Sequence, residues 1–314
     1  MKKTLILFTL IAITALISTD DAFAQNSTNP VKMKIGIDVM NIGKIDKETG
    51  SYDMIFWVSE SSDDYDFTTQ PPPIIDYENG YVEETSAVSI TQHFYKFKAR
   101  GTFYNDIDYR PHPFHHMDLA VHIKSVIPNT LDKLEFVVDP EYSGIRGESF
   151  VTVPGWEIGE PSFFVSNQTY PWGEFSRYSA IIPVESSPIG VFMKYISPTL
   201  MIAGFAFSTY WIPAKYSDEK IEIIAATLVG SIFFHITFLG AGIPSVQYLT
   251  FADKVMMSIY AVFAMCLFAV LLHKKFESEL KEKYTMIVEK NLNKKFRIMT
   301  PIVAVVIFLI AQVL

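Results

Sequence analysis

Residues 218–240 read DEKIEIIAATLVGSIFFHITFLG, and this stretch decides the fold. As a helix it is long enough to cross a bilayer, because a rise of about 1.5 Å per residue carries about 20 residues across the hydrocarbon core. Its first residues are charged, and Glu222 lies one turn inside the apolar run. A carboxylate at that depth is costly in lipid, so it should face protein or water.

Steps of three or four residues from Asp218 place one set of side chains along a single face of this helix. The set begins with two carboxylates, becomes apolar and ends on a small residue: Asp218, Glu222, Ala226, Val229, Phe233, Ile236 or Thr237, and Gly240. Several copies of the helix around an axis would form a pore with an acidic ring and a hydrophobic constriction, which are features that select cations and gate by dewetting. The alternative is a non-conducting bundle in which Glu222 pairs with a lysine such as Lys215 or Lys220.

Three further apolar runs accompany this one and predict a transmembrane domain over 188–314. The four helices are expected at about 191–212, 219–240, 251–272 and 297–314. Helices of a soluble bundle would show a polar face, and these mostly do not. Residues 273–297 hold eight lysines and arginines, so the positive-inside rule places the linker 273–296 in the cytoplasm. Within it, Glu277–Lys295 is expected to be a solvated helix extending the third or fourth span.

The first 24 residues have the pattern of a signal peptide. Lys2 and Lys3 precede an apolar run, and Ala22-Phe23-Ala24 gives a small-x-small cleavage site. The alternative is a first transmembrane helix, but the apolar run is short for that purpose. The sequence therefore predicts a mature chain that starts near Gln25 and is exported.

Between 25 and 187 the chain has the pattern of an extracytoplasmic β-sandwich. Short alternating runs separated by Gly, Pro, Asn and Asp favour antiparallel strands in an immunoglobulin-like arrangement. The candidate strands are Lys34–Val39, Tyr52–Val58, Val88–Tyr95, Met117–Val126, Leu134–Val138, Phe150–Val153, Ser162–Val165 and Phe175–Pro183. The single cysteine, Cys266, excludes an intrachain disulfide and a cysteine-rich zinc site. Phosphate-loop, HExxH and GxSxG motifs are absent, so no enzyme is expected.

Several local motifs join this architecture to a known family. They are Tyr109-Arg110-Pro111-His112-Pro113-Phe114-His115, Gly155-Trp156-Glu157-Ile158, Pro198, Asp218-Glu219-Lys220, Pro244 with Tyr248 and Thr250, and Arg297-Ile298-Met299-Thr300-Pro301. With the sandwich and the four spans they resemble the pentameric ligand-gated ion channels, the Cys-loop receptor family, in its prokaryotic branch. The resemblance covers essentially the whole mature chain.

The chain departs from the family's pattern at several places. The two family cysteines would fall near Asn105 and Leu119, and His115 stands at the aspartate of the signature loop. Ser186 lies near the place of an expected arginine, and the segment 57–73 is shortened. These departures concern the agonist site and the gating contacts rather than the fold.

The resemblance implies a cation-selective homopentameric channel in the bacterial inner membrane, opened by an extracytoplasmic ligand, proton or divalent cation. The second span would line the pore, with Asp218, Glu222 and Ala226 in its selectivity region and Val229, Phe233 and Ile236 as the hydrophobic gate. Monovalent cations would permeate, and lipid would surround the helices. A membrane-anchored sensing module that does not conduct is the alternative function.

The resemblance also implies two functional regions outside the membrane. The gating interface would be formed by Asp46, Lys47, Glu48, Pro113, Phe114, His115 and Pro244. The hairpin Phe163–Phe175 would cap the agonist site, with Tyr170 and Trp172 near its tip as candidates to hold an ammonium group by cation–π attraction. A rigid turn without a ligand is the alternative there.

Metal and proton binding have weaker patterns. His112, His115, His116 and His122 are close in sequence, but alternation along strands would scatter them, so no metal site is expected there. A proton-sensing role and ordinary loop histidines both stay open. Asp63, Asp64 and Asp66 are a weak candidate for calcium, with a solvated acidic loop as the alternative. No resident cofactor is expected, and modulation by calcium or protons stays open.

The net charge of −8 divides unevenly along the chain. Residues 25–190 hold 12 Lys and Arg against 24 Asp and Glu, or −12, whereas residues 191–314 hold 12 against 8, or +4. This balance argues against a nucleic-acid partner, since such proteins are basic. An acidic outer domain would concentrate cations by electrostatic focusing, in agreement with the acidic residues of the second span.

Overall fold

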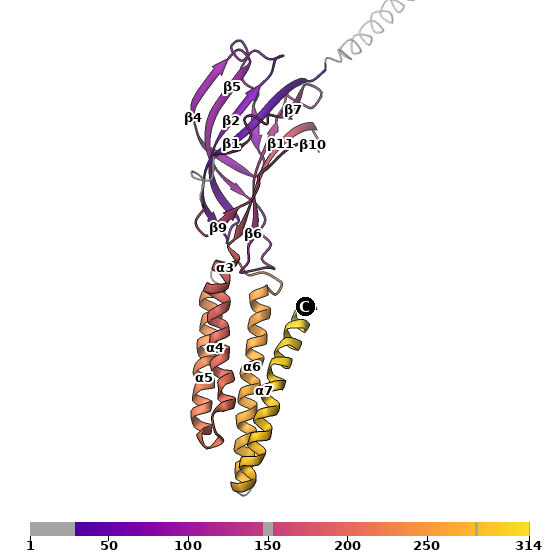
Figure 1. Cartoon of the computed structure of the whole chain (residues 1–314). Helices are drawn as coiled ribbons and strands as arrows, with labels where there is room; N and C mark the ends of the chain where they lie inside the picture. Colours follow the sequence, from indigo (N-terminus) through magenta and orange to yellow (C-terminus); the bar gives the residue numbers. More distant parts are fainter. Residues whose placement is uncertain (1–28, 147–152, 241, 280–281, 314) are drawn as a thin grey trace, which may run out of the picture.

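The computed structural model describes residues 29–146, 153–240, 242–279 and 282–313. Two parts of different composition follow one another: a β-sandwich, and below it four long helices (Figure 1). The predicted signal peptide lies outside the described residues, as does most of the predicted strand Phe150–Val153.

The sandwich consists of two facing sheets. In the first sheet the order is β4 (Gly80–Thr91), β5 (Phe94–Tyr104), β2 (Ser51–Ser61), β1 (Val31–Asp46) and β7 (Leu134–Val138), and β8 (Gly144–Ile145) also pairs with β1. In the second the order is β10 (Ser162–Tyr170), β11 (Gly173–Ser186), β6 (His116–Ser125) and β3 (Ile75–Tyr77), and β9 (Trp156–Ile158) pairs with β11. Alternate side chains of β2 point inward, among them Met54, Phe56 and Val58, and they form the core with residues of the second sheet such as Leu119 and Ile182.

The first sheet is mixed, which corrects the expectation of an antiparallel sandwich. β1 pairs in parallel with β7, from Val31 opposite Leu134 to Ile35 opposite Val138, and in parallel with β8. β6 and β7 belong to opposite sheets, so the chain crosses between the sheets over 126–133. A strand that arrives by such a crossing, and not through a tight hairpin, is free to run in the same direction as β1.

The predicted strand Val88–Tyr95 is also wrong as a single strand. The chain turns at Gln92-His93, and Thr91 of β4 pairs with Phe94 of β5. Both turn residues are polar, and neither is a glycine or proline, which would have marked a tight hairpin in the sequence.

Four helices in the second part are long and apolar enough to cross a membrane. The first comprises α3 (Pro188–Val191), the π-helical segment η2 (Phe192–Ile196), α4 (Ser197–Ser208) and the 3₁₀ segment η3 (Thr209–Trp211). After the 3₁₀ segment η4 (Ala214–Tyr216), the second comprises α5 (Ser217–Phe234) and the π-helical segment η5 (His235–Leu239). The third and fourth are α6 (Phe251–Glu279) and α7 (Glu282–Val313). The segment predicted as linker 273–296 is therefore mostly helical, as extensions of α6 and α7.

The helices run alternately away from and toward the sandwich, so that α7 ends beside the level where α6 begins (Figure 1). Buried apolar residues of α4, α5 and α6, such as Ala206, Ile224 and Phe263, form a second core. The Tyr210 hydroxyl is 2.7 Å from the hydroxyl of Thr300 and ties the first helix to α7. This packing fixes which face of α5 turns inward and which stays open.

Candidate functional site

The face of α5 and η5 that carries the predicted pore residues is exposed in the single chain. Val229, Phe233 and Ile236 are 66%, 63% and 71% exposed, and Asp218, Glu222 and Ala226 are exposed as well. The opposite face is buried at Ile224 and Ser231. The helix therefore packs against its own subunit with one side and leaves a graded stripe exposed on the other, acidic at its start and apolar further along.

The acidic end of this stripe lies at the start of α5, far from the sandwich (Figure 1). Asp218 lies in the first turn, where the helix dipole favours a carboxylate. Its Oδ1 also lies 2.6 Å from Nζ of Lys274 in α6, a pair that is open to solvent and therefore weak. The lysine of this pair comes from α6, and Lys215, one of the lysines considered for Glu222, lies over the ring of Tyr216 at 4.6 Å.

A second candidate region joins the sandwich to the helices, at the loop between β5 and β6. The amide of Phe251 donates to the carbonyl of Arg110 at 2.8 Å, and the amide of Ala252 donates to the carbonyl of His112 at 2.9 Å. These two amides belong to the first turn of α6, where a helix has no internal acceptors for its N–H groups. The sandwich therefore supplies the cap of α6.

Two histidines of this loop form a buried chain that reaches η5. Nε2 of His112 lies 2.7 Å from the carbonyl oxygen of Leu239, and its Nδ1 lies 2.9 Å from Nε2 of His115. Because a carbonyl only accepts, His112 donates from Nε2, accepts at Nδ1, and so receives the proton of His115. Burial lowers the pKa of His112 to about 4 and that of His115 to about 3, and the ammonium of Lys47 acts in the same direction. Both rings are neutral near pH 7.

Aromatic contacts continue this joint. The predicted gating residue Phe114 lies edge-on to Phe251 with ring centroids 5.8 Å apart, and Phe251 in turn packs against Phe308 of α7 at 6.0 Å. Pro113 follows a cis peptide bond, and the tight turn is closed by the amide of Phe114, which donates to the carbonyl of Pro111. The loop thus touches η5 and α6, and Phe251 extends the contact to α7.

The turn between β1 and β2 contributes the predicted residues Asp46, Lys47 and Glu48. The Asp46 carboxylate accepts the amide of Glu48 at 2.9 Å, and the hydroxyl of Tyr109 donates to the carbonyl of Lys47. The Lys47 ammonium lies 4.9 Å from the centre of the Trp156 ring. Burial lowers the pKa of Lys47, and the positive charge of the nearby Lys194 lowers it further.

The link between η5 and α6 completes the region. Tyr248 accepts the amide of Tyr109 at its hydroxyl, at 3.1 Å, and the Arg110 guanidinium lies over its ring at 5.2 Å. Pro244 lies half-buried in the same link. The structure therefore brings the predicted gating loops to one joint. It also shows the bond from His112 to Leu239, which the sequence could not predict because the two residues are 127 positions apart.

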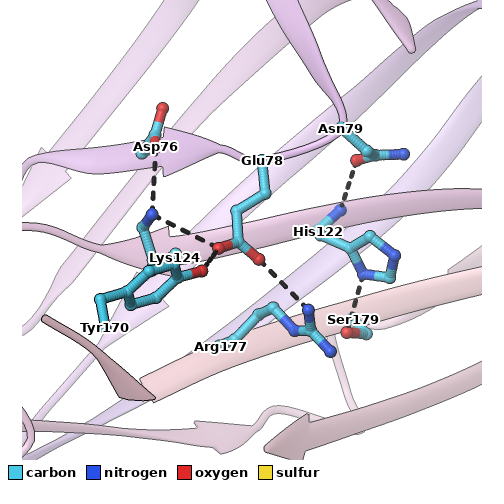
Figure 2. Close-up of polar contacts among 8 residues, drawn as sticks. All are labelled: Asp76, Glu78, Asn79, His122, Lys124, Tyr170, Arg177 and Ser179. Carbon is cyan, nitrogen blue, oxygen red and sulfur yellow. Dashed lines mark hydrogen bonds and ion pairs between the residues drawn. The ribbon is translucent and has the colours of Figure 1, made fainter. Parts of the chain in front are cut away.

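A third region lies on the second sheet, where the predicted ligand residues Tyr170 and Trp172 stack with centroids 5.2 Å apart. Figure 2 shows Glu78 between Lys124 and Arg177, with Tyr170 donating to the same carboxylate. Lys124 Nζ is 3.3 Å from Glu78 and 3.4 Å from Asp76, and Arg177 is 3.3 Å from Glu78. We call Asp76, Glu78, Lys124, Tyr170 and Arg177 the Glu78 cluster.

Electrostatics hold the Glu78 cluster in its charged form. Burial favours the neutral acid, but hydrogen bonds from Tyr170 and Lys124 outweigh it and lower the pKa of Glu78. Burial likewise disfavours the charged form of Lys124. The hydrogen bond to Glu78 and the charge of Glu78 outweigh this burial effect, so the pKa of Lys124 is raised. Lys124 lies 4.4 Å over the Tyr170 ring, so the place expected for a ligand's ammonium group already holds an internal one. Sequence reasoning missed Glu78, Lys124 and Arg177, which come from three separate segments.

The remaining candidates are the predicted calcium ligands and the histidine His122. Within the described ranges no group of three His, Cys, Asp or Glu side chains could hold a metal ion. Of the predicted calcium residues, Asp63 and Asp64 are exposed, and Asp66 accepts bonds from the amide and the hydroxyl of Thr68 at 2.8 and 2.5 Å. His122 is held apart from the other histidines, 2.9 Å from the Ser179 hydroxyl (Figure 2).

Comparison of the chain with protein-family models and with curated proteins finds no match in either.

Proposed function

We propose that this protein is a cation-selective ion channel of the pentameric ligand-gated type, in the inner membrane of a bacterium, with the sandwich on the extracytoplasmic side. Five copies would surround a pore lined by α5, and monovalent cations would permeate. The observation that carries the proposal is the exposed stripe of α5, with Asp218 and Glu222 at one end and Val229, Phe233 and Ile236 further along.

The stripe has the chemistry that such a pore requires. Carboxylates from several subunits would stabilise cations at the inner mouth, and rings of Val229 and Phe233 would form a narrow apolar passage that empties of water when closed. A helix that served only as an anchor would gain nothing from an exposed carboxylate such as Glu222, one turn inside the apolar run.

The strands provide a route from the Glu78 cluster to the pore. β6 and β11 are paired without interruption from Lys124 opposite Arg177 to His116 opposite Glu185. At about 3.3 Å per residue this pair spans roughly 26 Å and ends at the joint. A ligand that rearranges the cluster would therefore displace the strands whose lower ends carry the β5–β6 loop and α3.

The alternative function is a membrane-anchored sensor that does not conduct. The joint and the Glu78 cluster would serve a sensor equally well, so the stripe on α5 discriminates between the two. Current recording from purified protein in planar bilayers, scanning pH, divalent cations and small amines, separates them.

A matched pair of cysteine variants sharpens that experiment. Cys266 is buried, so the native chain offers little reaction with a polar thiol reagent. Phe233→Cys places a thiol on the stripe, and Phe205→Cys places one on the similarly exposed outer face of α4, where the native side chains are 63% and 59% exposed. A cationic thiosulfonate should reduce the current of Phe233→Cys alone. Absence of current under every condition, or equal effects on both variants, would contradict the proposal.

A further inference from the structure

A carboxylate points into the sandwich at its end far from the helices. Glu60 follows Phe56 and Val58 on the inward face of β2, because alternate residues of a strand share a face. It is only 1% exposed, and its Oε2 has no hydrogen-bond partner among the described residues. A buried carboxyl oxygen without a partner is costly, and it calls for a ligand or a proton.

Glu60 lines a cavity of about 570 Å³, which lies within the size range of pockets for small organic molecules. The cavity is lined by residues of β2, β3, β4, β5 and the segment leading to β3, and Pro72, Tyr77, Tyr81, Tyr95 and Phe97 contribute to its walls. Tyr81 is 50% exposed and marks the outer rim. The buried hydroxyl of Tyr77 has no partner among the described residues either.

The charges around this cavity favour a cation. Its lining contains no lysine, arginine or histidine. Asp76 also lines it, but that carboxylate pairs with Lys124 at 3.4 Å. Burial raises the pKa values of Tyr77 and Tyr95 in the lining, so their hydroxyls stay neutral. An anionic guest would find no positive partner in this lining, whereas an ammonium group would pair with the ionised acid and meet aromatic faces.

We propose that the Glu60 cavity is a binding site for a small organic amine, with the carboxylate of Glu60 as counter-ion and the tyrosine rings of the walls around the ligand's apolar part. The site lies within one subunit and is separate from the Glu78 cluster, where the cation is supplied by Lys124. The proposal does not depend on conduction.

The state of Glu60 gives binding a distinctive signature. Burial raises the pKa of Glu60 to about 8, so the acid is mostly protonated at pH 7 in the empty cavity. An ammonium group brought against it would stabilise the carboxylate and expel the proton. Binding should therefore release close to one proton per amine at pH 7.

Isothermal titration calorimetry of the purified full-length chain with benzylamine tests this directly. Titration at pH 7 in two buffers of different ionisation enthalpy gives the number of protons released. Benzyl alcohol, which has the same ring and no charge, should bind at least tenfold more weakly and release none.

Variants separate this cavity from other sites. Glu60→Gln is close in shape to the protonated acid and should weaken benzylamine at least tenfold, while Tyr81→Ala removes a rim ring and should weaken it several-fold. Asp63→Asn neutralises an exposed acid nearby, and Trp172→Ala alters the neighbourhood of the Glu78 cluster; both should leave the affinity unchanged. Failure of benzylamine to bind at millimolar concentration, binding without proton release, or equal affinity in Glu60→Gln with a native-like gel-filtration profile would each overturn the proposal.

Discussion

Mild acid should loosen the joint between the sandwich and the helices through His112 and His115. Both are buried, at 5% and 4% exposure, and both are held neutral by the bonds described above. A proton on Nδ1 of His112 would face the N–H of His115, and the pair would have to rearrange. The folded state therefore resists protonation that the unfolded chain accepts freely.

The size and sign of the effect follow from the pKa values. Each histidine titrates near 6.5 when unfolded, against about 4 for His112 and about 3 for His115 when folded. Since both folded values are depressed, the stability they provide is present above pH 6.5 and lost as the pH falls below it. Between pH 7 and pH 5 the loss is about 2 kcal/mol for each histidine.

Glu60 acts in the opposite direction, because its folded pKa is raised to about 8 and its contribution is lost as the pH rises. The comparison must therefore be made between the native chain and His112→Gln/His115→Gln, in which Glu60 is the same. The pH-dependence of the two proteins should differ by about 4 kcal/mol between pH 7 and pH 5, or roughly 10 °C in melting temperature.

The assay is thermal unfolding in detergent, followed by tryptophan fluorescence at pH 7, 6 and 5. His116→Gln, at a half-exposed histidine paired with Asp118 and Glu185, serves as the control and should behave as the native chain does. Parallel pH profiles for the native protein and the double variant would refute the assignment of buried neutral histidines at the joint.

Three further predictions concern single side chains. Phe114→Ala removes the contact with Phe251 and should reduce agonist-evoked current at least several-fold without altering ion selectivity, and Phe114→Leu should partly restore it; unchanged responses would exclude Phe114 as a coupling contact. Lys124→Met vacates the face of the Tyr170 ring and should strengthen tetramethylammonium binding by about 1 kcal/mol, measured by fluorescence titration; equal affinities would argue against the occupied ring. Tyr52→Phe removes the buried hydroxyl bonds to the backbone of β6 and should cost about 2 kcal/mol in thermal unfolding, and a loss near zero would mean that these bonds contribute little.

The sequence was sufficient for features that depend on local period and hydropathy. Apolar runs located the four long helices, and alternation located β2 and the hairpin whose arms are β10 and β11. The exposed stripe of α5 also follows from helical spacing, because a residue every three or four positions shares a face whatever the fold. Whether that face lines a pore is not a local property.

What the sequence could not give depends on contacts between distant segments. The parallel pairing of β1 with β7 results from a crossing between sheets, which leaves no local signature. Glu78, Lys124 and Arg177 meet only because β3, β6 and β11 are neighbours in one sheet. Glu60 could not be predicted as a site residue for a similar reason. Alternation along β2 predicts that its side chain points inward, but the missing hydrogen-bond partner of its Oε2 is known only from the three-dimensional structure.

The reversal potential in a tenfold gradient of potassium chloride tests the pore most directly. If α5 lines a cation-selective pore with Asp218 and Glu222 at its mouth, the native current should reverse near the potassium equilibrium potential, about 59 mV from zero. Glu222→Gln should move the reversal toward zero, and Glu83→Gln, at an exposed acid of β4, should not. A native current that reverses near zero or near the chloride potential, or a selectivity unchanged in Glu222→Gln, would contradict the account.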